Sequence, residues 1–271
     1  MRRPLLAALL LAAAACARRA PPPPDLSQDP AALLAAVRAT QDKVRSVQGS
    51  ARVRIDAPGM KVPGGLQEFV AAEKPDRLHL ETLDFFGNVA AVLVASGGRF
   101  ALYDAREHVL YRGEATPENV SRFLPVLLPV EELVTILCGS APILPGRPVS
   151  VQPGDGSLLL TLAQGAVGQR LQVGELAAIS SSRVRRLGRD AAGREVEDAP
   201  AYDLDLNLRR HRAGVVFPLE LKLIAPSARS TVELTWGEDL DINGRVDPKL
   251  FEMNPPKGAR VVELGSGQEQ R

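Results

Sequence analysis

The sequence predicts a mainly β protein with a few helices, an α+β fold in which a curved antiparallel sheet forms an incomplete β-barrel with a helical lid. Runs such as Tyr202 to Leu208, where apolar and polar side chains alternate, are typical of half-buried antiparallel strands. Turn residues such as Ser96-Gly97-Gly98 separate these runs, which number about 11 and are joined mostly by hairpins. Hydrophobic residues make up 45% of the chain, enough for a sizeable core. A meander of this length has to hide one face and its edges, and curling under a lid does both.

Residues 1–15 have the features of a secretory signal peptide: a basic start, then an unbroken run of Leu and Ala from Leu5 to Ala15. As a helix this run would reach about 17 Å, well short of a hydrocarbon core of about 30 Å. Cys16 follows at once, and the small residues before it resemble the lipobox of bacterial lipoproteins. That resemblance implies that Cys16 is lipidated and becomes the first residue. The alternative is an ordinary signal peptide with Cys16 incidental.

Lipidation would anchor the chain, because two or three long acyl chains bind a bilayer in effect permanently. By resemblance to the sorting rules of Gram-negative lipoproteins, Ala17 in place of Asp implies the outer membrane, on its periplasmic face. Residues 16–29 include four consecutive prolines from Pro21, which predicts a Pro-rich tether reaching up to about 40 Å. We expect the folded domain at 30–264 and a disordered tail at 265–271.

Three helices are expected. Asp29-Pro30 is an N-cap followed by Pro at the first helical position, so the first helix should run from 30 to 47. A short helix should open at Thr116, and another should run from about 130 to 138 and end at Gly139. The last has an apolar surface too wide to face water and is expected to cover the sheet as a lid. The first helix carries one apolar stripe of Leu33, Leu34, Val37, Val44 and Val47.

Several sequence motifs follow one another along the chain in a recognisable order. The first helix leads into Val47–Val53, then come Pro75–Glu81 and the apolar turn Leu83–Gly87. The mid-chain helix Leu127–Leu133 and the closing segment Phe251–Val262 complete the series. In this order the chain resembles the bacterial outer-membrane lipoprotein family with the LolA/LolB-like half-barrel fold, over most of residues 30–264. The segment from about 140 to 200 is longer than expected for LolB itself, so a relative with a different ligand is as plausible as a lipoprotein acceptor.

The resemblance implies an apolar half-barrel cavity that binds acyl chains of lipoproteins or other lipids and takes part in their reception or insertion at the outer membrane. The implied partners are those acyl chains, the outer membrane and a periplasmic carrier protein. An alternative is a structural or assembly lipoprotein with a filled barrel that binds a protein partner. The alternating strands and the lid helix indicate which side chains would line the cavity: Val53, Ile55, Leu78, Leu80, Val92, Val94, Leu102, Leu133, Ile136, Leu137, Leu204, Leu206, Leu208, Leu221, Leu223, Val232, Leu234 and Trp236.

An apolar turn between two strands is the candidate for membrane contact. Leu83, Phe85 and Phe86 lie where turn residues are usually polar. By resemblance to LolB, which presents an apolar side chain on such a loop, they would insert into the acceptor leaflet. The alternative is that one Phe is buried and the other lies under the lid.

Other classes of function find little support. Positive and negative residues nearly cancel, 33 against 32, so no nucleic-acid partner is expected. With two cysteines and three scattered histidines, no metal site is expected, and no cofactor is implied. No Gly-x-Ser-x-Gly or phosphate-binding glycine loop is present, so we do not expect an enzyme. Cys138 is expected to be a buried, inert thiol. The arginine-rich stretch from Arg183 to Arg194 is expected to be a solvated hairpin face, with phosphate headgroup contact as the alternative.

Overall fold

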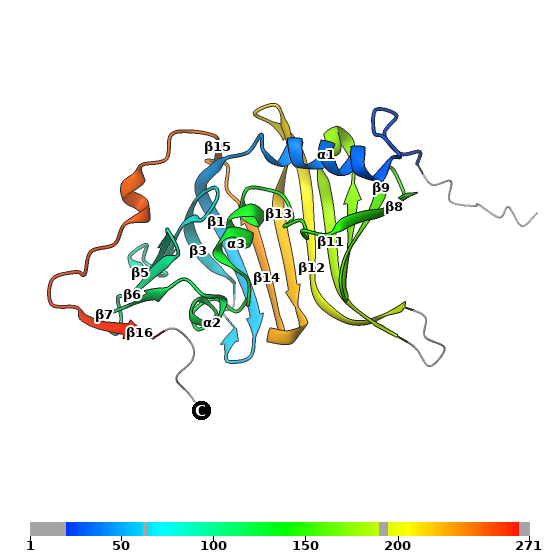
Figure 1. Ribbon diagram of the computed structural model, residues 1–271. Coiled ribbons are helices and arrows are strands. Elements are labelled where there is room, and N and C mark those ends of the chain that lie inside the picture. Colours follow the sequence, from blue (N-terminus) through cyan, green and yellow to red (C-terminus); the bar gives the residue numbers. More distant parts are fainter. Residues whose placement is uncertain (1–19, 62–63, 190–194, 266–271) are drawn as a thin grey trace, which may run out of the picture.

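A computed structural model describes residues 20–61, 64–189 and 195–265. The signal peptide, Cys16, the first residues of the tether and residues 266–271 of the expected tail lie outside the described residues. Within them the chain forms one open, curved sheet that is not closed into a barrel, with helices on its concave side (Figure 1). This confirms the predicted fold class.

The strand order across the sheet is β16-β7-β6-β5-β4-β3-β1-β14-β13-β12-β11-β10-β9-β8, with β2 and β15 also paired to β1. The strands of the first half are β1 (Ser46–Ala57), β2 (Met60–Lys61), β3 (Leu66–Glu73), β4 (Arg77–Leu83), β5 (Val89–Ser96), β6 (Arg99–Asp104) and β7 (Val109–Glu114). Those of the second half are β8 (Arg147–Pro153), β9 (Leu158–Gln164), β10 (Val167–Val173), β11 (Ile179–Arg189), β12 (Glu195–Arg212), β13 (Val215–Ala225), β14 (Ser230–Trp236), β15 (Asp241–Ile242) and β16 (Arg260–Leu264).

The described residues thus form a 16-stranded sheet, more than the expected number. Part of the difference comes from strands that are very short or contain proline. β2 and β15 have two residues each, and β8 contains two prolines. Such strands form because a neighbouring strand pairs with them through backbone hydrogen bonds. Hydrophobic periodicity in the sequence does not reveal this pairing.

The C-terminal strand pairs differently from the rest of the sheet. β16 runs parallel to β7, with Arg260 opposite Val109 and Leu264 opposite Gly113, whereas the other strand pairs are antiparallel. The chain returns to this edge through the 3₁₀ turn η3 (Pro248–Phe251), which packs on the outer side of β4 and β5. The end of the chain therefore covers what would otherwise be the free edge at β7.

Helix α1 (Pro30–Gln41) begins as expected, with the Asp29 carboxylate accepting the Ala32 N–H at 2.8 Å. It ends six residues earlier than the expected 47. Val47 instead lies in β1, opposite Ala72 of β3 and Ile242 of β15. The prediction failed here because the spacing of Val47 continues the helix stripe, whereas its β-branched side chain favours a strand and strand pairing holds it there.

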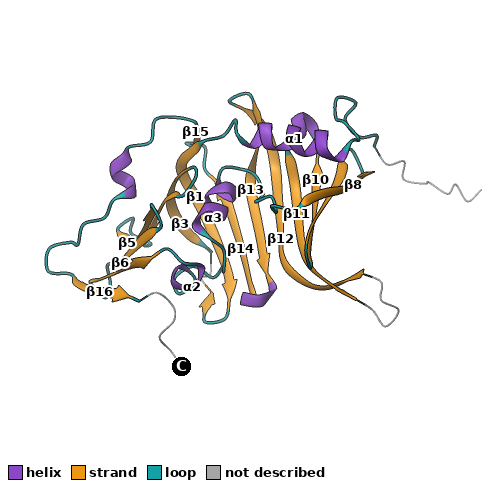
Figure 2. Cartoon of the chain, in the orientation of Figure 1, coloured by secondary structure: helices purple, strands orange, loops and turns teal. Residues whose placement is uncertain are grey.

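Two further α-helices, α2 (Pro117–Val120) and α3 (Val130–Leu137), match the expected short helices. The 3₁₀ turns η1 (Glu175–Ala177) and η2 (Pro226–Ala228) lie in connections between strands. Helix α1 lies against β8, β9 and η1 at one end of the sheet, and α3 lies over β3 and β4 (Figure 2). The two helices therefore cover separate parts of the concave face.

The described part of the expected tether, residues 20–29, lies against the domain. The Ala20 N–H donates to the Asp155 carboxylate at 2.7 Å, and the Gly156 N–H donates to the Ala20 carbonyl at 2.9 Å. Leu26 packs against the hydrophobic core. Ala20 and Leu26, within the expected tether, thus contact the domain that is expected from residue 30.

Gly139 ends α3 and allows its close approach to the sheet. Its φ is +78°, and a Cβ there would come within 2.6 Å of the Phe217 ring. Gly97, in the β5–β6 turn, also has a positive φ of +59°, but a Cβ there would meet nothing within 4 Å.

We predict that Gly139→Ala lowers the free energy of unfolding by roughly 2–4 kcal/mol, because overpacking against Phe217 adds to the cost of a left-handed backbone. Gly97→Ala should cost about 1–2 kcal/mol, the backbone part alone. Urea unfolding of both variants measures the difference. Equal losses would contradict the close contact between α3 and Phe217.

Candidate functional site

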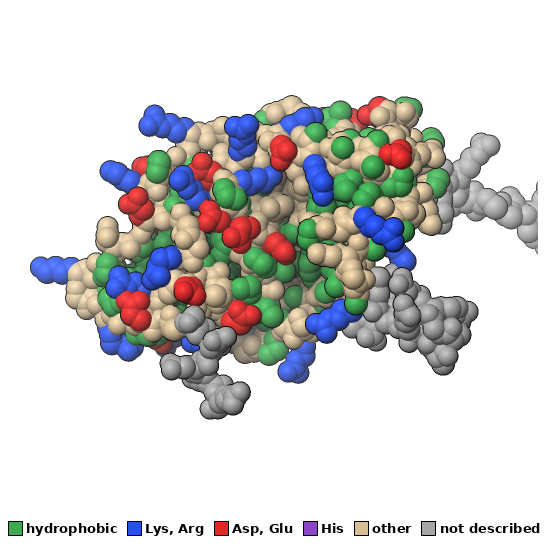
Figure 3. All heavy atoms as spheres, in the orientation of Figure 1, with side chains coloured by type: hydrophobic (Ala, Val, Ile, Leu, Met, Phe, Trp, Pro, Cys, Tyr) green, Lys and Arg blue, Asp and Glu red, His purple; other side chains and the backbone are tan. Residues whose placement is uncertain are grey.

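An apolar cavity of about 120 Å³ lies between the concave face of the sheet and α3. We call it the lid cavity. Its lining is apolar except for one carboxyl side chain, that of Glu68. In Figure 3, hydrophobic side chains lie in the hollowed part of this face, with charged side chains around them. The lining residues are Val53, Ile55, Glu68, Leu78, Leu80, Leu124, Pro125, Val126, Leu133, Ile136, Leu137, Leu221, Leu223, Val232 and Leu234.

Strand register builds the floor of the lid cavity as two rows of branched side chains. Leu221, Leu234 and Val53 stand opposite one another across β13, β14 and β1. Leu223, Val232 and Ile55 form the next row, two residues along. Because side chains alternate along a strand, the two rows share the concave face, and Leu78 and Leu80 extend it on β4.

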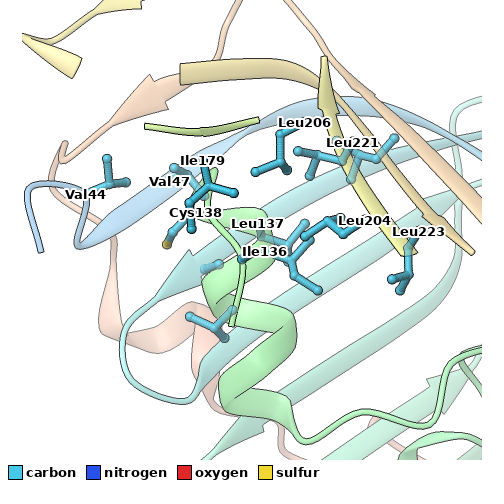
Figure 4. Close-up of a cluster of buried hydrophobic side chains, with 14 of the residues drawn as sticks. Val44, Val47, Ile136, Leu137, Cys138, Ile179, Leu204, Leu206, Leu221 and Leu223 are labelled. Carbon is cyan, nitrogen blue, oxygen red and sulfur yellow. The ribbon is translucent and has the colours of Figure 1, made fainter. Parts of the chain in front are cut away.

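The roof comes from α3 and from the segment before it. Leu133, Ile136 and Leu137 are spaced i, i+3 and i+4 and therefore share one helix face. Figure 4 shows Ile136 and Leu137 close to Leu204, Leu221 and Leu223 of the sheet. The apolar face of α3 thus lies on the apolar rows of the sheet, as expected of a lid.

Residues 121–129, which we call the lid strap, complete the roof. Leu124, Pro125 and Val126 line the lid cavity on one side and a second hollow of about 430 Å³ on the other. The Ser230 hydroxyl donates to the Pro125 carbonyl, and the Phe123 ring lies 5.2 Å from that of Tyr111. The lid strap is therefore the wall between the interior and an outer hollow, fastened at two points.

The lid cavity is small for a ligand site. Pockets that enclose a small molecule usually measure about 300–1,000 Å³. The cavity and the outer hollow would together reach that size if the lid strap moved aside. As it stands, the lid cavity has room for only a short stretch of hydrocarbon.

Eleven of the side chains predicted to line an acyl cavity surround the lid cavity: Val53, Ile55, Leu78, Leu80, Leu133, Ile136, Leu137, Leu221, Leu223, Val232 and Leu234. Leu204, Leu206 and Trp236 instead are buried in the main core, and Leu102 packs against that core. That the eleven contact acyl chains stays a prediction.

Val92, Val94 and Leu208 lie elsewhere. Val94 belongs to a separate cluster with Ala101 and Leu110, against which Val92 packs. Leu208 has a φ of +47° and is 49% exposed, so the alternation of β12 is interrupted there. Alternation shows which residues share a face, but not which face is concave or where a strand departs from regular geometry.

Sequence reasoning missed Glu68 and the three strap residues. Leu124, Pro125 and Val126 lie in a segment without helix or strand periodicity. Its apolar composition was the one sign that it is buried. Glu68 is a charged residue at a buried strand position, which a search for apolar alternation passes over.

Glu68 is 8% exposed and projects from β3 into the lid cavity. Thr82, opposite it on β4, donates its hydroxyl to Glu68 Oε1 at 3.0 Å. Burial raises the pKa of the Glu68 carboxyl above its ordinary value, and the Thr82 hydrogen bond offsets part of that effect.

The turn between β4 and β5 presents two aromatic rings to solvent. Phe85 is 96% exposed and Phe86 is 83% exposed, with their rings edge to face at 5.5 Å. The Asp84 carboxylate holds the turn by accepting the N–H groups of Phe86 and Asn88 at 2.8 Å, and these hydrogen bonds lower its pKa. Leu83, at the end of β4, is half-buried. The alternative of a buried Phe in this turn is therefore wrong.

Other candidate groups are engaged in the fold. Burial raises the pKa of the Cys138 thiol to about 12, as expected of an inert cysteine. Arg183 and Arg185 pair with Asp205 and Asp203 on the neighbouring strand. In the described part of the chain, His, Cys, Asp and Glu side chains form no cluster that could hold a metal ion.

Solved structures match the fold of this chain, although no family model and no curated protein matches it. A DUF1329 family protein from Desulfovibrio piger aligns with a TM-score of 0.52 and 12% identity, over 83% of this chain and 98% of that one. A domain named as an outer membrane lipoprotein-sorting protein, from Vibrio parahaemolyticus, gives 0.52 and 9% over 80% and 95%. A LolA superfamily protein from Nitrosomonas europaea gives 0.51 and 11% over 82% and 97%. The resemblance to the LolA-like fold is thus confirmed at the level of fold.

Among the described helices, none combines the length and apolar character needed to cross a bilayer.

We predict that Glu68→Gln stabilises the fold at pH 7, because it removes a buried charge and keeps an acceptor for Thr82. The folded pKa lies above the unfolded value of about 4.5, so the unfolded chain releases this proton first as the pH rises. Wild-type stability is thus lost from about pH 4.5 up through the folded pKa. The gap between the variant and wild type should widen over that range, as measured by urea unfolding.

Glu73→Gln, on the same strand but outside the lid cavity, is the control for removing a carboxyl; it also removes the ion pair with Arg77, so it should not stabilise the fold as Glu68→Gln does. A gap between Glu68→Gln and wild type that is the same at pH 4 and pH 7 would contradict a buried carboxyl with a raised pKa.

Proposed function

We propose that this protein is a lipoprotein, anchored through Cys16 on the periplasmic face of the outer membrane, whose lid cavity receives acyl chains of lipoproteins or other lipids. The observation that carries the proposal is the apolar cavity between two rows of branched side chains and an amphipathic lid helix. The LolA-like fold supports it, since one protein that shares the fold is named for lipoprotein sorting. A periplasmic carrier protein is the proposed donor.

The energetics favour such a site for hydrocarbon. Shielding two or three acyl chains removes on the order of 1,000 Å² from water, worth about 25 kcal/mol at 25 cal/mol per Å². A concave apolar surface under a movable cover can supply this shielding. We propose binding rather than catalysis, because the lining offers one carboxyl group and no nucleophile.

The second candidate is an assembly lipoprotein that binds a protein partner and never opens. It is favoured by the packed core under α1 and by the small volume of the lid cavity. Direct measurement of acyl binding separates the two candidates.

Trp236 makes that measurement possible because it is the one tryptophan of the chain and lies on β14 beside the cavity residue Leu234. We predict that acyl esters carrying bromine on the chain quench Trp236 fluorescence saturably. Leu80→Gln should weaken this binding about tenfold, because the amide gives up the apolar contact of a leucine that lines the cavity.

Leu208→Gln, a half-exposed leucine outside the lid cavity, is the matched control and should bind as wild type does. Thermal unfolding of both variants checks that the fold is retained. An absence of saturable quenching in the wild type would favour the filled, partner-binding alternative.

We further predict that Phe85 and Phe86 insert into a bilayer. Burying one phenylalanine side chain is worth about 1.5–3 kcal/mol, so replacing both with Ser should reduce binding to phospholipid vesicles at least about a hundredfold. Flotation of vesicles with protein measures the bound fraction, in a Cys16→Ala background that removes the proposed anchor.

Val149→Ser, at an exposed apolar position on β8, is the control for a general loss of surface hydrophobicity. Quenching of Trp236 by brominated esters should stay unchanged in the Phe85 and Phe86 double variant. Vesicle binding equal to wild type would exclude this turn from membrane contact.

A further inference from the structure

Glu68 is the one charged side chain in the lining of the lid cavity. Across the sheet it stands between Ala51 of β1 and Thr82 of β4. Glu68 therefore brings a polar group to the wall of an apolar space.

One half of this carboxyl lacks a partner in the described residues. Oε1 accepts the Thr82 hydroxyl, and Glu68 makes no other hydrogen bond there. Three described side-chain atoms are fully buried without a hydrogen-bond partner: His79 Nε2, Asn119 Oδ1 and Trp236 Nε1. Glu68 Oε2 is not one of them, so it is not fully buried. Oε2 is thus reachable from the cavity that Glu68 lines.

The charge is not compensated by the protein around it. Among the described residues, no Lys or Arg forms an ion pair with this carboxyl, and its one side-chain hydrogen bond comes from Thr82. A buried carboxylate without a cation is costly, and it demands hydrogen-bond donors to offset the lost water. A donor that enters the lid cavity would meet that demand.

We propose that Glu68 is the specificity-determining residue of the lid cavity. It accepts a hydrogen bond from a hydroxyl or N–H group at the polar end of an acyl ligand, and it rejects acyl ligands that end in a carboxylate. This inference rests on the proposed function and adds the ligand class: long-chain amphiphiles with a neutral head that carries a donor.

The expected preference follows from the chemistry of the carboxylate. A hydrogen bond to a charged acceptor is among the stronger ones and favours a donor-bearing head about tenfold or more over one that only accepts. A ligand carboxylate would face a like charge in an apolar space and bind more weakly than either.

The test compares four probes with the same chain: dodecanol, dodecanamide, methyl dodecanoate and dodecanoate. Each displaces a brominated acyl ester from the full-length protein at pH 8, and recovery of Trp236 fluorescence reports displacement. For the wild type, the alcohol and the amide should act at about tenfold lower concentration than the methyl ester, and dodecanoate should act at the highest concentration.

Glu68→Leu should remove both differences, with the methyl ester unchanged and dodecanoate acting as the ester does. Glu68→Gln, which keeps the shape, should remove the penalty on dodecanoate. Glu73→Gln, a carboxyl removed from the same strand outside the cavity, should keep the wild-type order.

Equal displacement by all four probes from the wild type would overturn the inference and leave acyl binding intact. The inference is also overturned if Glu68→Leu keeps the wild-type order of displacement by the four probes. If no brominated ester binds in the first place, the proposed function fails, and the inference fails with it. Should Glu68→Leu not fold, the wild-type order and Glu68→Gln still decide.

Discussion

An open curved sheet has a concave apolar face, and the need to cover that face determines the rest of this structure. Val53, Leu234 and Leu221 form one row across three strands, and a second row runs beside it. Left in water, these rows would form an apolar patch of the kind that soluble proteins avoid. The amphipathic face of α3, the lid strap and the glycine that ends α3 all serve to hide it.

The concave face is packed tightly at one end of the sheet and loosely at the other. At the α1 end the interior is packed, with Leu158, Leu160 and Leu162 of β9 fully buried. Beneath α3 the packing leaves the lid cavity, whose roof includes the lid strap, held by the Ser230 hydrogen bond and by the contact of the Phe123 and Tyr111 rings. The interior is thus packed at one end of the sheet and hollow at the other.

The fold class and much of the cavity floor could be predicted from the sequence, because alternation along β1, β13 and β14 reports side-chain faces directly. Alternation does not report which face is concave, so Val94 was assigned to the cavity although it lies in the outer cluster with Leu110. Local backbone geometry could not be predicted from the pattern either. Val47 continues the helix pattern but pairs in β1, and Leu208 has a positive φ that interrupts the alternation. Glu68 and the lid strap line the cavity because of tertiary contacts, and no local sequence pattern predicts such contacts.

The proposed function requires that hydrocarbon occupy the space under α3 and the lid strap. Mass spectrometry of lipid that co-purifies with the full-length protein tests it most directly, with Leu80→Gln purified in parallel. We expect acyl lipid in about stoichiometric amount with the wild type and a large reduction with the variant. Wild-type protein free of lipid, or lipid retained equally by both, would contradict it.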